Sequence, residues 1–260
     1  MGQVALITGA SAGLGEQFAH RFARDGHDVI LVARNEARLN ALAERLRIQK
    51  VRAFVMPFDL ADPKTPGALF DAVKEKGLEV DFLVNNAGFG TSGSFLDLAL
   101  ERELEMVQVN CTALLALCHL FVRPMKARGR GRVLNIASTA AFQPGPFMAT
   151  YFATKAFVLS FSEALGHELE GTGVTVTASC PGATMTEFSK VSGNDKSRLF
   201  QRPGVARAED VVDEAYEAMM EGVDVKVHGW LNVLAAQSVR LAPRAVLRSI
   251  AASLNLPPGS

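Results

Sequence analysis

The fold is decided near the start of the chain, by the stretch Val4-Ala5-Leu6-Ile7-Thr8-Gly9-Ala10-Ser11-Ala12-Gly13-Leu14-Gly15. Its first five residues form a short apolar run typical of a buried strand, and a helical periodicity begins at Leu14. The glycines between them allow a sharp turn that brings backbone N–H groups close to a phosphate, which the start of a helix attracts. Because an ordinary strand–helix connection also contains glycines, nucleotide binding has to be supported by the rest of the chain.

Apolar runs alternate with amphipathic stretches along most of the chain. The predicted strands are Val4–Thr8, Asp28–Ala33, Val51–Phe58, Val80–Val84, Arg132–Ala137 and Val174–Ser179. The predicted helices are Leu14–Asp25, Glu36–Arg47, Lys64–Lys76, Asp97–Arg128 and Thr150–Glu170, and the glycines expected to end four of them are Gly26, Gly77, Gly129 and Gly171. Apolar strands separated by helices predict a parallel sheet covered on both faces. We therefore expect an α/β fold: a single-domain, Rossmann-type doubly wound sheet of about seven strands flanked by helices.

The end of the chain differs in charge from the rest. Val225–His228 is a candidate seventh strand, and two amphipathic stretches separated by Pro243 follow it. Residues 1–224 carry 23 basic and 27 acidic residues, a net charge of −4, whereas the remainder carries four basic residues and no acidic ones. We expect residues 1–228 to form the main domain and residues 229–260 a helical extension packed on it. The four basic residues after Asp224 are Lys226, Arg240, Arg244 and Arg248, and residues 225–260 are called the tail.

The composition excludes several classes of protein. The 260 residues include 27 Lys+Arg and 27 Asp+Glu, and this balance argues against a nucleic-acid binder held by phosphate contacts. Cys111, Cys118 and Cys180 are too few for a disulfide framework, so we expect buried thiols in a reducing, cytoplasmic protein. The five histidines have no metal-ligand spacing, and no metal site is predicted. The longest apolar stretch, 111–122, is shorter than the roughly 20 residues that span a bilayer and predicts a core helix.

The end of the second strand bears on the choice of nucleotide. An acidic residue about 20 positions after such a glycine turn would bind the ribose 2′-hydroxyl of NAD. Here Ala33-Arg34-Asn35 occupies that place, nineteen positions beyond Gly15, and no carboxylate ends the strand. The planar guanidinium of Arg34 suits a 2′-phosphate, which favours NADP. The alternative is that Arg34 is a solvated residue at the start of the next helix, beside Glu36.

Further motifs follow the later strands in a fixed order. They are Asn85-Asn86-Ala87-Gly88, Ser138, Tyr151-Phe152-Ala153-Thr154-Lys155 and Pro181-Gly182. Together with the Thr-Gly-x3-Gly-x-Gly turn, this set resembles the short-chain dehydrogenase/reductase family, in its branch of about this chain length. The resemblance covers residues 3–222 and includes the Tyr-x3-Lys motif.

The catalytic prediction rests on Ser138, Tyr151 and Lys155. Tyr151 and Lys155 are four residues apart and share one helix face, where an ammonium group is expected to lower the pKa of the phenol. Such a phenol can exchange a proton with a carbonyl or alcohol oxygen, and Ser138 can hydrogen-bond the same oxygen. The resemblance further implies that Lys155 contacts the nicotinamide ribose and that Asn110 takes part in a proton relay through the lysine. Taken singly, Tyr151 and Lys155 also suit a surface pair, Ser138 suits a turn former, and Asn110 suits a solvated side chain.

The cofactor prediction combines the glycine turn with what the resemblance implies. By the resemblance, Asp59 accepts from the adenine amino group, and Thr184 and Thr186 reach the nicotinamide carboxamide or the phosphates. Turn formers and helix caps are the alternative for these positions. The residues expected to bind the cofactor are Gly9, Ser11, Gly13, Leu14, Gly15, Arg34, Asp59, Leu60, Asn86, Ala87, Gly88, Tyr151, Lys155, Pro181, Gly182, Thr184 and Thr186.

The expected activity is that of an NADP-dependent oxidoreductase which moves a hydride between the nicotinamide and a carbonyl or alcohol carbon. The apolar stretch Ala140–Met148 favours an apolar ketone, aldehyde or acyl substrate, and the polar stretch Ser189–Pro203 is typical of a lid. The alternative is an NADP-binding sensor or scaffold without turnover, although a sensor needs no proton donor.

The apolar and basic side chains of the tail bear on contacts with other subunits and with membranes. Its apolar side chains are sufficient for a subunit interface, so we expect a homo-oligomer. They are Leu231, Leu234, Val239, Leu241, Val246, Leu247 and Ile250. Contact of the basic tail with an anionic membrane is a second interpretation, which we favour less than a helix pair packed on the core with its arginines in solvent.

Overall fold

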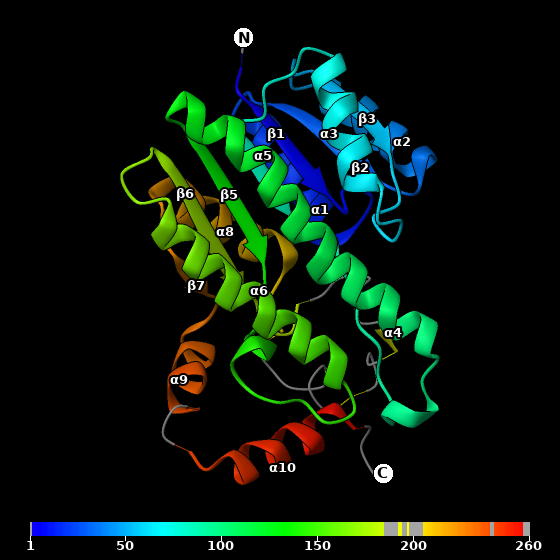
Figure 1. Ribbon diagram of the computed structural model, residues 1–260, viewed down its shortest axis with the longest axis vertical. Coiled ribbons are helices and arrows are strands. Elements are labelled where there is room, and N and C mark those ends of the chain that lie inside the picture. Colours follow the sequence, from blue (N-terminus) through cyan, green and yellow to red (C-terminus); the bar gives the residue numbers. More distant parts are fainter. Residues whose placement is uncertain (1, 185–191, 194–196, 198–204, 240–241, 257–260) are drawn as a thin grey trace.

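A seven-stranded parallel sheet forms the centre of the molecule (Figure 1). This computed structural model describes residues 2–184, 192–193, 197, 205–239 and 242–256. The strands lie in the order β3-β2-β1-β4-β5-β6-β7, so the chain crosses over once between its two halves, as in a doubly wound sheet. The strands are β1 Val4–Thr8, β2 Asp28–Ala33, β3 Ala53–Pro57, β4 Phe82–Asn85, β5 Gly131–Ile136, β6 Val174–Cys180 and β7 Val225–Val227.

Helices cover both faces of the sheet. Alternate residues of β1 point to opposite faces: Leu6 packs in a cluster with residues of α3, α5 and α6, and Ile7 in a cluster with residues of α1, α2 and α8. Both side chains are fully buried, and each such burial stabilises the fold by about 1.5–3 kcal/mol. The helices are α1 Gly13–Arg24, α2 Glu36–Arg47, α3 Thr65–Glu75, α4 Leu100–Val107, α5 Leu114–Arg128, α6 Ala149–Glu168, α8 Ala208–Glu221, α9 Trp230–Ser238 and α10 Arg244–Asn255.

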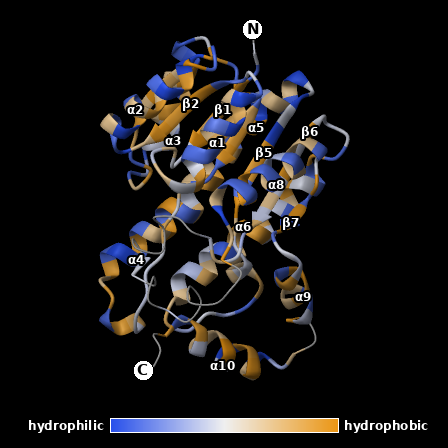
Figure 2. Ribbon diagram, turned by 180° about the vertical axis from the view of Figure 1, so that it is seen from behind, coloured by the Kyte–Doolittle hydropathy of each residue, from blue (hydrophilic) through white to orange (hydrophobic). Residues whose placement is uncertain are grey.

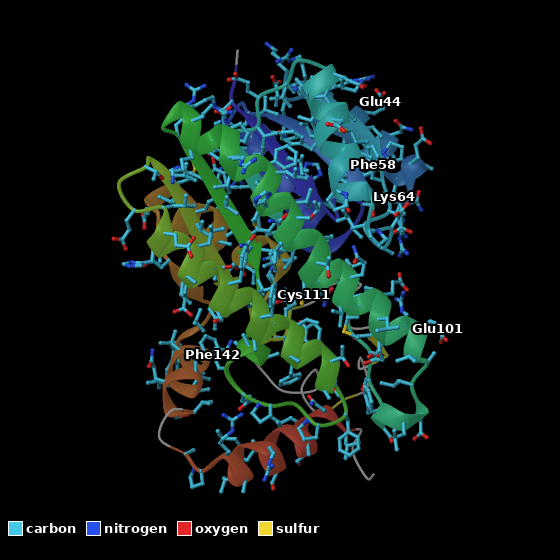
Figure 3. All side chains as sticks on the ribbon, viewed as in Figure 1. Glu44, Phe58, Lys64, Glu101, Cys111 and Phe142 are labelled. Carbon is cyan, nitrogen blue, oxygen red and sulfur yellow. The ribbon has the colours of Figure 1, made fainter. Side chains whose placement is uncertain are left out.

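Most of the described charged side chains lie outside these layers, although Asp28, Asp81, Glu103 and Lys155 are buried. Glu44, Lys64 and Glu101 lie at the periphery, whereas Cys111 lies inside (Figure 3). Cys111, Cys118 and Cys180 are buried free thiols, as predicted, and burial raises the pKa of Cys118 to about 12.

Most predicted elements are confirmed, several with the same bounds. The strands at 4–8 and 28–33 and the helix at 36–47 begin and end where the sequence pattern places them. The four glycines predicted to follow helices all have positive φ, between 64° and 80°. The third strand is shorter than predicted and begins at Ala53, and α10 begins one residue after Pro243.

The helix predicted over Asp97–Arg128 is wrong in detail. A short 3₁₀ turn, Phe95–Asp97, comes first, α4 begins at Leu100, and a π-helical segment, Gln108–Ala113, separates α4 from α5. Leu100–Arg128 is apolar and long enough to cross a membrane by composition, but half of its most apolar window is buried in the protein. Its α5 part packs on the sheet through Leu117, Phe121 and Met125, and therefore acts as the predicted core helix.

The C-terminal helices α9 and α10 lie beyond the edge formed by the carboxyl ends of the strands (Figure 1). Trp230, Leu231 and Leu234 are exposed on α9, on the side away from its buried Ala236. Figure 2 shows apolar residues on both α9 and α10. Of the apolar tail residues predicted for an interface, Val246 and Ile250 are also exposed. Leu247 is instead buried, because it faces the body of the protein. Leu241 and most of Ser189–Pro203 lie outside the described residues.

Candidate active site

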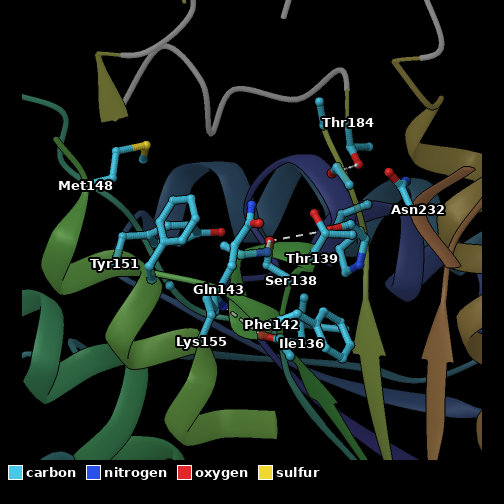
Figure 4. A pocket seen from close by; sticks show the side chains of 18 of the residues that line it. Ile136, Ser138, Thr139, Phe142, Gln143, Met148, Tyr151, Lys155, Thr184 and Asn232 are labelled. Atoms are coloured by element: carbon cyan, nitrogen blue, oxygen red, sulfur yellow. Dashed lines mark hydrogen bonds between the residues drawn. The ribbon is translucent and has the colours of Figure 1, made fainter. Parts of the chain in front are cut away.

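A cavity of about 460 Å³ opens at the carboxyl ends of the strands (Figure 4). Residues from the β1–α1 turn, the end of β4, the end of β5, α6 and the β6 turn line it, and α9 and α10 complete its wall. The predicted site residues that line it are Gly9, Gly13, Leu14, Asn86, Ala87, Gly88, Ser138, Tyr151, Lys155, Pro181, Gly182 and Thr184.

The glycine turn is shaped by close packing. Gly9 and Gly13 have φ values of +67° and +58°, which favour glycine. A Cβ atom on Gly15 would lie 2.1 Å from the carbonyl oxygen of Gly9, so the helix can approach the turn only without a side chain there. Gly15 therefore shapes the turn from behind rather than lining the cavity. The resulting cradle of backbone N–H groups at the start of α1 fits the diphosphate of a dinucleotide.

The end of β4 is fastened to this turn. The amide of Asn86 donates to the carbonyl oxygen of Thr8 at 2.9 Å. The Thr8 hydroxyl in turn accepts hydrogen bonds from the backbone N–H groups of Asn86 and Ala87, each at 3.0 Å. These bonds hold the two predicted cofactor-binding segments in a fixed relation to each other.

Ser138 begins the 3₁₀ turn Thr139–Phe142 directly after β5. Its hydroxyl accepts a hydrogen bond from the N–H of Ala140 at 3.1 Å and lies 3.4 Å from the carbonyl oxygen of Pro181. It also hydrogen-bonds the phenol of Tyr151. The strand end, the β6 turn and α6 thus converge on one hydroxyl group.

The phenol of Tyr151 is buried in the first turn of α6. Burial raises its pKa to about 12, and the hydrogen bond with Ser138 opposes part of that rise. The prediction that Lys155 lowers this pKa is therefore wrong for the structure as it stands. The desolvation of the phenolate is the larger effect, and Tyr151 holds its proton at neutral pH.

Lys155 lies one turn further along α6 and is also buried. Its Nζ donates to the carbonyl oxygen of Ile136 at 2.7 Å and lies 5.8 Å from the centre of the Tyr151 ring. Burial lowers the pKa of this ammonium group to about 8. The shared helix face is confirmed, and the hydrogen bond of the lysine goes to the carbonyl oxygen of Ile136 at the end of β5.

Asn110 lies in the π-helical segment and does not line the cavity. Its Oδ1 accepts from the N–H of Phe89 at 3.1 Å, and its Nδ2 donates to the carbonyl oxygen of Phe89 and to Thr154. A Cβ atom on Gly88 would lie 3.0 Å from Asn110 Oδ1 and 3.6 Å from Lys155 Nζ, so the asparagine and the lysine flank this glycine. The side-chain amide of Asn110 fixes the segment after β4.

The remaining predicted cofactor residues lie farther from the catalytic groups. Arg34 follows β2, as predicted, with 64% of its side chain exposed and a 3.6 Å ion pair to Glu105. Asp59 is exposed after β3 and accepts from the N–H of Ala61, and Leu60 beside it is buried. Ser11 lies in the glycine turn without lining the cavity. Thr186 is outside the described residues.

The tail contributes residues that the sequence did not indicate. Asn232, Ala235 and Ala236 of α9 line the cavity with Val239, which caps this helix, and so do Ala251, Leu254 and Asn255 of α10. Their spacing follows one face of each helix. The sequence showed that these helices are amphipathic, but the fold had to be known to show which face meets the cavity.

Comparison with known proteins identifies the arrangement. The family model described as short chain dehydrogenase matches residues 3–197. The chain belongs to this short chain dehydrogenase family. One cavity is bordered by residues of the glycine turn, by Ser138, Tyr151 and Lys155, and by the β6 turn. The sequence motifs of this short chain dehydrogenase therefore lie close together in the folded protein.

Three similar proteins illustrate the family. The 7beta-hydroxysteroid dehydrogenase of Collinsella aerofaciens is 31% identical over 240 residues, which cover 88% of this chain and 90% of that protein. A putative ketoacyl reductase of Streptomyces coelicolor is 39% identical over 189 residues, 72% of each chain. The solved structure of a short-chain dehydrogenase from Sphingobium yanoikuyae in complex with NADPH is 36% identical and superposes with a TM-score of 0.82. That superposition covers 92% of this chain and 94% of that chain.

These findings establish the reaction class and the cofactor. This short chain dehydrogenase is an NADP-dependent oxidoreductase that acts on CH–OH or C=O groups by hydride transfer.

Proposed function

We propose that this enzyme reduces the carbonyl group of an apolar ketone, aldehyde or acyl compound with NADPH. One observation carries the proposal: the hydroxyl groups of Ser138 and Tyr151 lie together in a cavity otherwise bordered by mostly apolar side chains. The names of the hydroxysteroid and ketoacyl relatives agree with an apolar carbonyl compound.

In this proposal, Tyr151 is the general acid and Ser138 orients the substrate oxygen. A phenol that keeps its proton near neutral pH can give that proton to the oxygen as charge develops on it. A hydrogen bond from Ser138 to the same oxygen stabilises that charge. NADPH supplies the hydride when it is bound.

Lys155 and Asn110 support this chemistry. We assign Lys155 to the nicotinamide ribose and to proton supply, because its buried ammonium group borders the cavity beside Gly88. Asn110 is assigned to the relay through the lysine. Since its side-chain amide already bonds Phe89 and Thr154, we place its contribution at the backbone carbonyl.

The cofactor is proposed to lie along the carboxyl edge of the sheet. Its nicotinamide end would meet Tyr151, Lys155 and the β6 turn, and its diphosphate the glycine turn. The adenosine end would meet the residues after β2, β3 and β4, where Arg34 binds the 2′-phosphate. The proposed contacts are Gly9, Ser11, Gly13, Leu14, Arg34, Asp59, Leu60, Asn86, Ala87, Gly88, Tyr151, Lys155, Pro181, Gly182, Thr184 and Thr186, and Gly15 supports the glycine turn from behind.

We further propose that the protein is cytoplasmic and homo-oligomeric. Its three free, buried cysteines suit a reducing compartment. The exposed side chains of Trp230, Leu231 and Leu234 on α9 suit a contact between copies of the chain. Residues 1–228 are the proposed catalytic domain, with 229–260 as its extension. Light scattering measures the assembly, and co-sedimentation with anionic vesicles tests the less favoured membrane contact.

The proposal is tested with NADPH oxidation over a panel of apolar ketones, aldehydes and acyl thioesters. The wild type should turn over at least one of them, and Tyr151→Phe should bind NADPH equally well but lose turnover. NADPH binding by the wild type without turnover of any carbonyl compound would favour the sensor or scaffold alternative.

A further inference from the structure

The tail gives the cavity a wall of small side chains. Ala235 and Ala236 border it from α9, and Ala251 borders it from α10. Ala236 and Ala251 are 7% and 1% exposed, so both alanines are buried in the part of the tail that borders the cavity. Larger side chains at these positions would occupy the cavity itself, and the alanines therefore keep it wide.

The opposite wall is large and held firmly in place. Met148 and Phe152 border the cavity there. The Phe152 ring packs so closely on Gly145 that a Cβ atom added to this glycine would lie 2.3 Å from the ring. The backbone of this loop is tied at two places, by a 2.9 Å bond from the N–H of Gly93 to Phe147 and by a 2.8 Å bond from Asn255 to Pro146. The width of the cavity is therefore set by two walls that are fastened to each other.

The catalytic hydroxyl groups lie between these walls. In Figure 4, Ser138 and Tyr151 are seen between Met148 on one side and Asn232 of α9 on the other. A carbonyl oxygen bonded to both hydroxyl groups would thus place its carbon between Met148 on one side and the tail on the other, where the polar Asn232 borders the cavity beside the alanines. Apolar groups that fill this part of the cavity are favoured because their surface is removed from water.

The side chains that border the cavity are nearly all uncharged, which favours an uncharged substrate. Among the described residues that border the cavity, Lys155 is the one charged side chain, and its Nζ is bonded to Ile136. The described residues of the walls offer no second cation to a phosphate or carboxylate on the substrate.

We infer that the substrate is an uncharged ketone with a bulky apolar group on each side of its carbonyl, and that Ala236 and Ala251 determine its width. This inference rests on the proposed function and selects among its substrates. An aldehyde would leave one side of the cavity unfilled.

Two ketones that differ by one phenyl ring test the inference: 1,3-diphenylpropan-2-one and 1-phenylpropan-2-one. The wild type should reduce the two-ring ketone with a kcat/KM about tenfold or more above that of the one-ring ketone. Ala251→Phe should lower kcat/KM for the two-ring ketone by about tenfold and leave the one-ring ketone within about twofold. Ala236→Leu is the second variant, on the other helix. Ala245→Phe, on the exposed side of α10, is the matched control and should change neither value.

Folding is checked in each variant by its NADPH affinity, which should equal that of the wild type. Preference of the wild type for the one-ring ketone would overturn the inference while leaving the proposed function intact. An equal loss for both ketones in both folded cavity variants would overturn it as well. Turnover of neither ketone, with aldehydes or acyl thioesters reduced, would overturn the inference alone, whereas turnover of no carbonyl compound would overturn the proposed function with it.

Discussion

Asn255 donates a hydrogen bond of 2.8 Å to the backbone carbonyl of Pro146, a residue 109 positions earlier in the chain. Pro146 lies in the loop between Ser138 and Tyr151, and Asn255 is the last residue of α10 and is buried. The tail is thus joined directly to the segment that carries the catalytic hydroxyl groups.

Asn255→Ala should therefore affect substrate binding more than chemistry. The variant loses a bond to the half-buried carbonyl of Pro146, at a cost of about 0.5–1.5 kcal/mol, and frees the end of α10. We expect the KM of an apolar ketone to rise several-fold at similar kcat, with unchanged NADPH affinity. Ser249→Ala, on the exposed side of the same helix, is the control. Unchanged KM in Asn255→Ala would contradict a positioning role.

Ser138→Ala should lower kcat by about 10²–10³-fold, because it removes a donor to the developing oxyanion. It also removes the cap of a 3₁₀ turn, which should cost about 1 kcal/mol of the free energy of unfolding. Steady-state kinetics and urea unfolding separate the two effects. A variant that loses stability but keeps its kcat would leave Ser138 with a structural role alone.

Arg34→Asp should weaken NADPH binding by roughly 10–100-fold and NADH binding far less. A charge-assisted hydrogen bond is worth about 1.5–3 kcal/mol, and only NADPH carries the 2′-phosphate. Isothermal titration with both nucleotides measures the difference. Arg47→Asp, at the far end of α2, is the control and should change neither affinity. Equal losses for the two nucleotides in Arg34→Asp would remove the assignment.

Gly15→Ala should abolish NADPH binding or folding, whereas Gly67→Ala should not. The added methyl group at position 15 meets the carbonyl oxygen of Gly9, and at position 67 of α3 it meets open space. In the helix interior, alanine is favoured over glycine by about 0.5–1 kcal/mol, so Gly67→Ala should be slightly more stable than the wild type. Thermal unfolding with and without NADPH distinguishes the two variants.

The buried Lys155 predicts a pH dependence of stability. Its pKa is about 8 in the folded protein and near its ordinary value of 10.5 in the unfolded chain, so between these values the unfolded chain binds more protons. The contribution of Lys155 to the free energy of unfolding should therefore rise as the pH increases from 8 to about 10. Tyr151, with its pKa raised to about 12, acts in the opposite direction only above pH 10. Urea unfolding of the wild type and Lys155→Met should show a difference that grows with pH across this window; a constant difference would contradict it.

The sequence predicted the sheet well because its strands are buried on both faces and its turns require glycine. The apolar run Val4–Thr8, followed by a helix, can be interpreted as a buried strand of a parallel sheet. Gly26 and Gly129 have positive φ angles where helices end, so the sequence marks those ends with glycine. The π-helical segment was missed, since Gln108–Ala113 has the same apolar pattern as an α-helix and differs in the spacing of its backbone hydrogen bonds, which the pattern does not show.

The site was only partly predictable for a related reason. Ser138, Tyr151 and Lys155 follow strand ends or share a helix face, so local spacing places them together. The pKa of Tyr151 depends instead on the burial of the phenol and on the hydrogen bond of Lys155 Nζ to the Ile136 carbonyl. The spacing of the residues in the sequence determines neither. The contribution of Ala251 and Asn255 depends on how a distant helix folds back over the cavity.

Trp230 gives this molecule an optical reporter of its own. It is the single tryptophan of the chain, it is 71% exposed on α9, and it lies two positions before the cavity-lining Asn232. Any ligand that shifts α9 as it fills the cavity should change the emission of this indole, with no other tryptophan to obscure the signal. Substrate entry at the tail can therefore be timed by fluorescence in the unmodified enzyme, separately from the absorbance change that follows hydride transfer.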